Sequence, residues 1–184
     1  MEHPSNPAER RIARAVEVIR LEGAAIARLE SLLDERFSRA VQCILDCKGQ
    51  LIVSGIGKAG LVGQKVSATF ASTGTPSIFL HPVEALHGDL GRVRREDLVL
   101  ALSNSGETAE LNAVLPVMRK IGAGVIAVTG RSDSTLARHA DLVLDIGEVE
   151  EACPLKLAPT ASTSAMLALA DALAMVVLAE RGFD

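Results

Sequence analysis

The 184-residue chain has 48% apolar and 23% charged residues, a formal net charge of −4, and four Phe but no Trp or Tyr. This is the composition of an ordinary globular domain with an aliphatic core, not of a disordered segment. The negative charge and the scarcity of aromatic rings argue against a surface that binds nucleic acid through charge and base stacking.

Three cysteines, Cys43, Cys47 and Cys153, cannot form an even set of disulfides. We therefore expect reduced thiols and a cytoplasmic protein, with ordinary helix packing as the role of Cys43 and Cys47. The polar N-terminus does not have the pattern of a signal peptide. The segment 160–178 is nearly all apolar or small but contains Asp171, so we expect it in a core or subunit interface and not in a membrane.

The first 48 residues predict a helical arm. Pro7 after Asn6 is typical of a helix start, and apolar residues then recur with helical spacing as far as Ile44. Gly23 is a point at which this helix could divide in two. An arm of this length before the first strand is suited to packing on another subunit.

Beyond the arm, short apolar runs alternate with helix-length segments. Continuous apolar strands between helices predict a parallel sheet covered on both faces. With right-handed crossovers this gives a doubly wound three-layer αβα sandwich, a five-stranded α/β fold in one domain over 1–184, with the arm at 1–48 and the core at 49–184. The predicted strands are 51–53, 77–80, 98–102, 124–128 and 142–144.

The first and third predicted strands run into the two most polar, glycine-rich loops of the chain. These are Ser-Gly-Ile-Gly-Lys at 54–58, the glycine loop, and Ser-Asn-Ser-Gly-Glu-Thr at 103–108, the hydroxyl loop. Ligands of doubly wound sheets bind at the carboxyl ends of the strands, so both loops are candidates for one binding site.

The hydroxyl loop carries the stronger chemical signal. Ser103, Ser105 and Thr108 can donate to phosphate oxygens, Gly106 lets the backbone approach closely, and the following helix offers free N–H groups. The alternative is a helix cap, because Ser, Thr and Asn all cap helices. One cap needs one such residue, so three hydroxyls around a glycine favour a phosphate site.

The glycine loop is a weaker signal on its own. It lacks the spacing of a P-loop, and Gly60 comes one position early for a dinucleotide fingerprint. Lys58 is a solvated surface lysine in one interpretation and, at the mouth of a phosphate site, a functional cation in the other.

Two histidines follow the second predicted strand. His81 and His87 lie in one strand-end segment with Glu84 and Asp89 beside them. A single histidine is usually structural or solvated, whereas two in one loop with carboxylates suggest acid–base work or contact with a metal.

Together, these motifs resemble the arabinose 5-phosphate isomerases of the sugar isomerase (SIS) domain family, from about residue 51 to the end. The hydroxyl loop is common to all SIS domains and specifies only the superfamily. The more specific matches are Ala-Ser-Thr-Gly-Thr-Pro at 71–76, His-Gly-Asp-Leu-Gly at 87–91 and Glu-Ala-Cys-Pro-Leu at 151–155.

The resemblance implies interconversion of D-ribulose 5-phosphate and D-arabinose 5-phosphate through an enediolate, feeding 3-deoxy-D-manno-octulosonate and lipopolysaccharide synthesis. No cofactor is required by this chemistry, although His81 matches a position that can hold a zinc ion. The family is typically tetrameric, with active sites at subunit junctions. The resemblance ties Lys58, Glu110 and Glu151 to catalysis and Gly74, Thr75 and His87 to substrate contact, and we add His87 to the catalytic residues as a candidate for proton transfer. The other positions expected to bind substrate are Ser54, Gly55, Gly57, His81, Ser103, Asn104, Ser105, Gly106, Glu107 and Thr108.

Family members usually continue into a Ser-His-Pro-Gly-Gly segment, whose histidine is an acid–base candidate, and often into a pair of CBS domains. Neither occurs within the 184 residues, so we expect a single SIS domain without CBS domains. Two other functions stay open. One is an isomerase for another phosphosugar, such as a hexulose 6-phosphate, and the other is a non-catalytic phosphosugar sensor.

Overall fold

The computed structural model describes residues 6–155 and 157–182. Five parallel strands form one sheet in the order β2-β1-β3-β4-β5, which confirms the predicted sheet. The strands are β1 (Leu51–Gly55), β2 (Ser77–Phe79), β3 (Leu98–Leu102), β4 (Gly124–Thr129) and β5 (Leu142–Asp145).

Helices cover both faces of this sheet, as the continuous apolar runs require. Alternate residues of the central strand β3 face opposite sides: Leu100 packs in the core under α7, whereas Val99 packs in the core under α5. The helices are α1 (Pro7–Arg28), α2 (Glu35–Asp46), α3 (Gly57–Ser72), α4 (Pro82–Leu86), α5 (Ala109–Ile121), α6 (Thr135–His139) and α7 (Ala161–Arg181), with short 3₁₀ turns at Leu29–Ser31 and Asp89–Arg92.

The helical arm divides later than the sequence predicts. Helix α1 continues through Gly23, and the break falls after Arg28, where a 3₁₀ turn leads to Asp34. The Asp34 carboxylate accepts the backbone N–H of Arg36 at 2.8 Å and so begins α2. A strong N-cap signal therefore determines the break, whereas a single glycine costs a helix only about 1 kcal/mol.

Helix α7 is the most apolar helix of the described chain. By length and composition alone it could cross a membrane, but half of its most apolar window is buried inside the protein. It packs against α1, α2 and α3, and its Asp171 forms an ion pair with Lys65 of α3 at 2.5 Å. These contacts are those of a core helix, as the sequence predicts.

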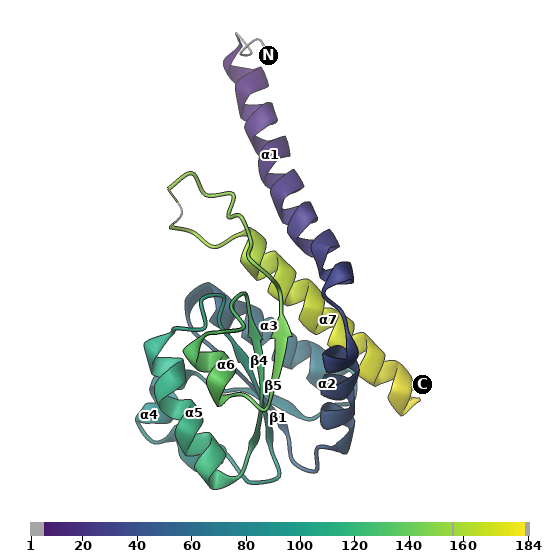
Figure 1. The fold of residues 1–184 in the computed structure, drawn as a ribbon, viewed down its shortest axis with the longest axis vertical. Coiled ribbons are helices and arrows are strands. Elements are labelled where there is room, and N and C mark those ends of the chain that lie inside the picture. The colour runs from purple at the N-terminus through teal and green to yellow at the C-terminus, as the bar shows by residue number, and fades with distance from the viewer. Residues whose placement is uncertain (1–5, 156, 183–184) are drawn as a thin grey trace.

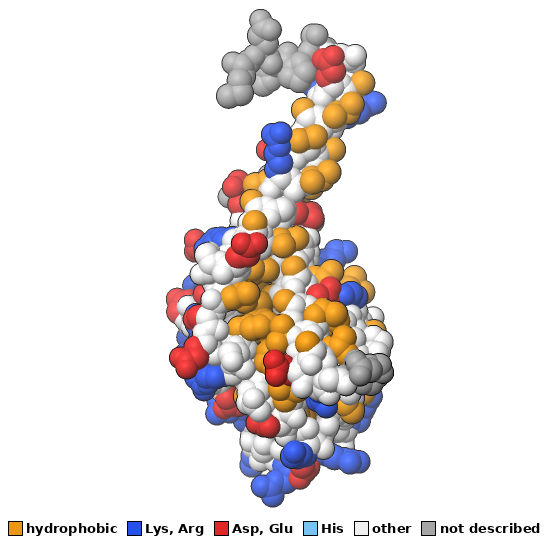
Figure 2. All heavy atoms as spheres, turned by 90° about the vertical axis from the view of Figure 1, so that its right-hand side faces the viewer, with side chains coloured by type: hydrophobic (Ala, Val, Ile, Leu, Met, Phe, Trp, Pro, Cys, Tyr) orange, Lys and Arg blue, Asp and Glu red, His pale blue; other side chains and the backbone are white. Residues whose placement is uncertain are grey.

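Helix α1 projects well beyond the body of the molecule, so that its first turns lie in solvent (Figure 1). Its exposed side carries the residues that we call the apolar stripe, and Figure 2 shows hydrophobic side chains continuing from the arm onto the body below it. The stripe consists of Ile12, Val16, Ile19 and Ile26, which are all exposed in the single chain.

Candidate functional site

The strand order places the two polar loops at a topological switch point. The chain leaves β1 toward β2 on one side and leaves β3 toward β4 on the other, which opens a crevice at the carboxyl ends of β1 and β3. Gly55 pairs with Leu102 in the parallel ladder. The glycine loop and the hydroxyl loop therefore begin side by side, as expected from the sequence.

Short hydrogen bonds fix the shape of the hydroxyl loop. The hydroxyl oxygens of Ser103 and Thr108 lie 2.8 Å apart, and the backbone N–H of Gly106 donates to Ser103 Oγ at 3.1 Å. Gly106 adopts a φ of 64°, and a Cβ there would lie 2.0 Å from Ser134 Oγ. Ser103 is buried beneath the turn, whereas Ser105 is exposed at its tip. The loop thus needs glycine at 106 both for its conformation and for space.

The two helices that start at the switch point have no side-chain cap. Ile56 precedes α3 without capping it, and the Thr108 hydroxyl, engaged with Ser103, does not cap α5. The first amides of both helices therefore have no partner within the helix and can bind an anion. The other described helices have side-chain acceptors at their starts, supplied by Asn6 for α1, Asp34 for α2, His81 for α4, Ser134 for α6 and Glu151 for α7.

Two open pockets lie at this edge of the sheet, and no residue lines both. The hydroxyl-loop pocket, of about 560 Å³, is lined by Asn104, Ser105, Gly130, Arg131, Glu148, Val149 and Glu150. The lysine pocket, of about 600 Å³, is lined by Gly57, Lys58, Gly60, Leu61, Gln64, His81, Leu157, Ala158 and Pro159. Sequence reasoning did not identify Arg131, Glu148 or Glu150. A signal existed for Arg131, which follows Thr129-Gly130 at the end of β4, another strand carboxyl end.

Lys58 and His81 come together in the lysine pocket, but His81 does not suit a zinc ion. Its Nδ1 accepts the backbone N–H of Val83 at 3.3 Å, so in the neutral ring the proton lies on Nε2 and no nitrogen lone pair is left for a metal. Within the described residues, no three His, Cys, Asp or Glu side chains gather closely enough to hold a metal ion. His81 is therefore better suited to capping α4 and donating a hydrogen bond.

The Glu151 carboxylate is fixed at the start of α7. It accepts the backbone N–H groups of Thr160 at 2.7 Å and Ala161 at 2.9 Å and also the hydroxyl of Ser162. Burial raises the pKa of Glu151, but the hydrogen bonds from Ser162 and Thr160 lower it by more, so this pKa lies below the usual glutamate value. Glu151 is thus an ionised helix cap. In the sequence it lies between Glu150, which lines the hydroxyl-loop pocket, and Leu157, which lines the lysine pocket.

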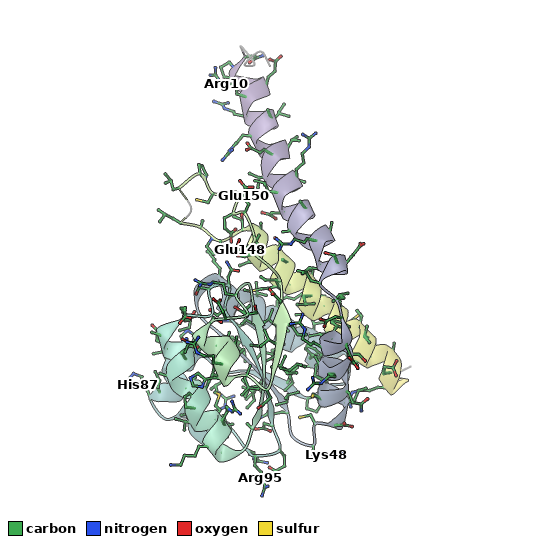
Figure 3. The ribbon with its side chains drawn as sticks, viewed as in Figure 1. Arg10, Lys48, His87, Arg95, Glu148 and Glu150 are labelled. Carbon is green, nitrogen blue, oxygen red and sulfur yellow. The ribbon has the colours of Figure 1, made fainter. Side chains whose placement is uncertain are left out.

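Several other predicted residues line neither of these pockets. His87 is exposed at the end of α4 and points outward in Figure 3, far from the labelled Glu148 and Glu150. Glu110 is exposed in the first turn of α5. Gly74 and Thr75 precede β2 and so lie at the opposite, amino edge of the sheet. The single chain therefore does not bring all the predicted residues to one place.

Two predicted substrate contacts have structural partners instead. The Ser54 hydroxyl is buried and donates to the carbonyl oxygen of Leu80 at 2.8 Å, which joins the ends of β1 and β2. Glu107 accepts the backbone N–H of Thr135 at 2.8 Å, and this bond lowers the pKa of Glu107. The parts of the two loops that line the pockets are therefore Gly57 in the glycine loop and the tip of the hydroxyl loop at Asn104 and Ser105.

A known family accounts for this arrangement. The SIS domain model matches residues 44–176, and the chain therefore belongs to the SIS domain family. The arabinose 5-phosphate isomerase KdsD of Escherichia coli K12 is 48% identical over 167 residues, which are 91% of this chain and 51% of that relative. KdsD of Pseudomonas aeruginosa is 48% identical over 172 residues, or 94% and 53% of the two chains.

The chain thus spans about half the length of the curated relatives that it matches. A solved structure from Escherichia coli CFT073, in complex with arabinose 5-phosphate, superimposes on it with a TM-score of 0.92 at 37% identity, covering 97% of this chain and 95% of the other. The fold is therefore that of this family.

Replacing Gly106 with Ala should distort the hydroxyl loop. We expect Gly106→Ala to lower the free energy of unfolding in urea by about 1–2 kcal/mol for the positive φ and by about 1–3 kcal/mol more for the clash with Ser134. The matched control is Gly57→Ala, which has a φ of 61° but open space around the new methyl group, so only the first cost applies. Equal losses in the two variants would contradict the packing at Gly106.

Proposed function

We propose that this SIS domain interconverts D-arabinose 5-phosphate and D-ribulose 5-phosphate. The observation that carries the proposal is the pair of uncapped helix N-termini at the switch point, beside a loop with three hydroxyls. That combination recognises a phosphate group. The names of the relatives and the sugar-phosphate complex of the solved structure support arabinose 5-phosphate as the particular sugar. Because those relatives are about twice as long, the activity is proposed here for the domain alone.

The phosphate binds at the hydroxyl loop in this proposal. Ser105 and the first amides of α5 donate hydrogen bonds to its oxygens. The Thr108 hydroxyl gives up its hydrogen bond to Ser103 and donates to the phosphate instead. Arg131, which lines the same pocket, adds a positive charge that offsets the nearby Glu148 and Glu150.

The reaction moves a proton between C1 and C2 of the open-chain sugar. A base removes the proton next to the carbonyl, an enediolate forms, and an acid returns the proton to the neighbouring carbon. Lys58, in the lysine pocket, stabilises the developing oxyanion. His87 and a glutamate, Glu110 or Glu151, transfer the proton. The chain works without a redox cofactor in this scheme, because the substrate is oxidised at one carbon and reduced at the next.

A homo-oligomer, expected to be a tetramer, would reconcile these roles with the position of His87. His87 lines neither pocket of its own chain, and in this proposal another copy presents it to the site. The apolar stripe on α1 supports such an assembly, because Ile12 and Ile19 are 65% and 69% exposed in the single chain. We place this assembly in the cytoplasm, in line with the odd number of cysteines in the sequence, and in lipopolysaccharide synthesis, as the family resemblance implies.

Removing the Ser105 hydroxyl should weaken phosphosugar binding. A hydrogen bond to a charged group contributes about 1.5–3 kcal/mol, so Ser105→Ala should raise KM for arabinose 5-phosphate at least about tenfold with kcat little changed. Ser72→Ala, an exposed serine at the far end of α3, is the control in a coupled isomerase assay. Binding without turnover by the unmodified chain would favour the sensor alternative, and absence of both would refute the proposed function.

Loss of the proton-transfer groups should act on kcat instead. We expect His87→Ala and Glu110→Gln each to lower kcat by at least about 10²-fold with KM little changed, the usual effect of one acid–base group. Lys58→Ala should damage both kcat and KM, because a cation aids binding and the enediolate alike. Exchange of solvent deuterium into C1 or C2 reports the proton abstraction directly. Undiminished exchange in both the His87 and Glu110 variants would show that other residues are responsible.

The apolar stripe should hold copies of the chain together. Light scattering after gel filtration should give a multiple of the 19.3 kDa chain mass, and Ile12→Glu with Ile19→Glu should reduce it. Arg10→Glu, which changes the charge of the same helix away from the stripe, should leave the mass unchanged. A stable monomer at micromolar concentration for the unmodified chain would refute the assembly.

A further inference from the structure

The segment after β5 forms one wall of the hydroxyl-loop pocket and is held from outside by the helical arm. Glu148 and Glu150 of this wall segment, residues 146–152, line the pocket. The segment runs beside α1 in Figure 1, although more than a hundred residues separate the two along the chain. Its position therefore depends on contacts with α1.

Arg28, at the end of α1, makes the first of these contacts. Its guanidinium group donates a hydrogen bond to the backbone carbonyl oxygen of Glu148. It also lies against Gly147, where a Cβ would be 2.6 Å from Arg28 Nη2 and 2.8 Å from its Cζ. Gly147 has a φ of 71° and its N–H donates to Asp145 Oδ1 at 2.6 Å. Arg28 thus occupies the space that any side chain at 147 would need.

The contact continues from Gly147 through Gly130 to the hydroxyl loop, where the Gly130 N–H donates to the carbonyl oxygen of Asn104 at 3.0 Å. A Cβ on Gly130 would lie 2.9 Å from the carbonyl oxygen of Gly147 and 2.6 Å from Asn104 Oδ1. In addition, Ile146 N–H donates to the carbonyl oxygen of Thr129 at 2.9 Å. Because these backbones are in close contact, a shift at Gly147 must be felt at Asn104, which lines the pocket.

A second arginine holds the other end of the wall segment. Arg14 Nη2 donates to the carbonyl oxygen of Ala152 at 3.3 Å, and Glu22 accepts the Ser164 hydroxyl at 3.0 Å, which joins α1 to α7. At about 100° per residue, Arg14 and Arg28 lie within roughly 40° of each other around α1, and the apolar stripe lies on the opposite side. One side of α1 therefore holds the site and the other is free for a partner copy.

We propose that Arg28 is a positioning residue, which fixes Glu148 and Glu150 relative to the hydroxyl loop without touching the substrate. Its physical effect follows from charge. Two carboxylates in the wall of a phosphate pocket repel the ligand more strongly the closer they move. Arg28 keeps this wall in one place and so sets the affinity for phosphosugar. The proposal rests on the proposed function for its ligand, but the anchoring itself can be measured without any ligand.

The experiment compares Arg28→Ala, Arg28→Lys and a control, Arg10→Ala, whose side chain has no hydrogen bond or ion pair with any described residue. Amide hydrogen exchange is measured over residues 146–152, and KM and kcat are measured with arabinose 5-phosphate. Arg28→Ala should speed exchange in this segment at least about tenfold and raise KM about tenfold, with kcat within about twofold. Arg28→Lys should restore part of both effects, and Arg10→Ala should match the unmodified chain.

A double-mutant cycle tests the contact from its other side. Gly147→Ala should raise KM in the unmodified background because its methyl group displaces the Arg28 guanidinium from the carbonyl oxygen of Glu148, in addition to the strain of alanine at a φ of 71°. It should raise KM less when Arg28 is already Ala, because only the strain is then left. If Arg28→Ala does not fold, the Gly147→Ala variant in the unmodified background still tests the contact. Unchanged exchange in 146–152 together with additive effects of the two changes would overturn the proposal. If the unmodified chain neither binds nor converts arabinose 5-phosphate, the proposed function fails, and the exchange experiment alone decides whether Arg28 anchors the wall.

Discussion

Unpaired backbone amides at the starts of α3 and α5 are the constraint from which the rest of the site follows. A parallel sheet that reverses its winding between β1 and β3 must bring two helix starts to one crevice. Each start exposes N–H groups that need an acceptor. The other described helices take that acceptor from a side chain, whereas here the hydroxyls of the loop turn toward each other and leave the amides free. An anionic ligand would complete the hydrogen bonding of the fold itself, and this is the physical reason for proposing that the site recognises phosphate.

The loop between β5 and α7 connects this anion site with the lysine pocket. Its first part supplies Glu148 and Glu150 to one pocket, and its last part supplies residues 157–159 to the other. Glu151 fixes the middle of the loop to the start of α7, and arginines of α1 hold it from outside. Because the opposite side of α1 carries the apolar stripe, assembly through that stripe would restrain the same helix that positions the loop. If the proposed assembly and the proposed role of Arg28 both hold, oligomerisation and substrate affinity are physically coupled through α1.

The layout of the fold could be predicted from the sequence because its signals are local. Continuous apolar runs such as 98–102 specify buried parallel strands, and three hydroxyls around Gly106 exceed the needs of one helix cap. The roles of Arg28 and Glu148 could not be predicted, since each depends on which distant segments the tertiary fold places side by side, whereas Arg131 had a sequence signal in its position after β4. The position of the break in the helical arm, after Arg28 and not at Gly23, was missed for a different reason. The Asp34 cap at the start of α2 determines where the helices divide more strongly than Gly23, which only weakens a helix.

The hydrogen bonds of Glu151 also bear on which glutamate transfers the proton. A general base works best when its pKa is near the working pH, and a lowered pKa makes a carboxylate a weaker base. Both oxygens of Glu151 already accept bonds from the start of α7, and these bonds lower its pKa. To act as the base, Glu151 would have to give up the Ser162 hydroxyl and loosen the helix that it caps. Glu110 does not cap another helix, since it is exposed in the first turn of α5, next to the amides that we propose bind the phosphate. The geometry therefore favours Glu110 for proton transfer, with Glu151 maintaining the loop that shapes both pockets.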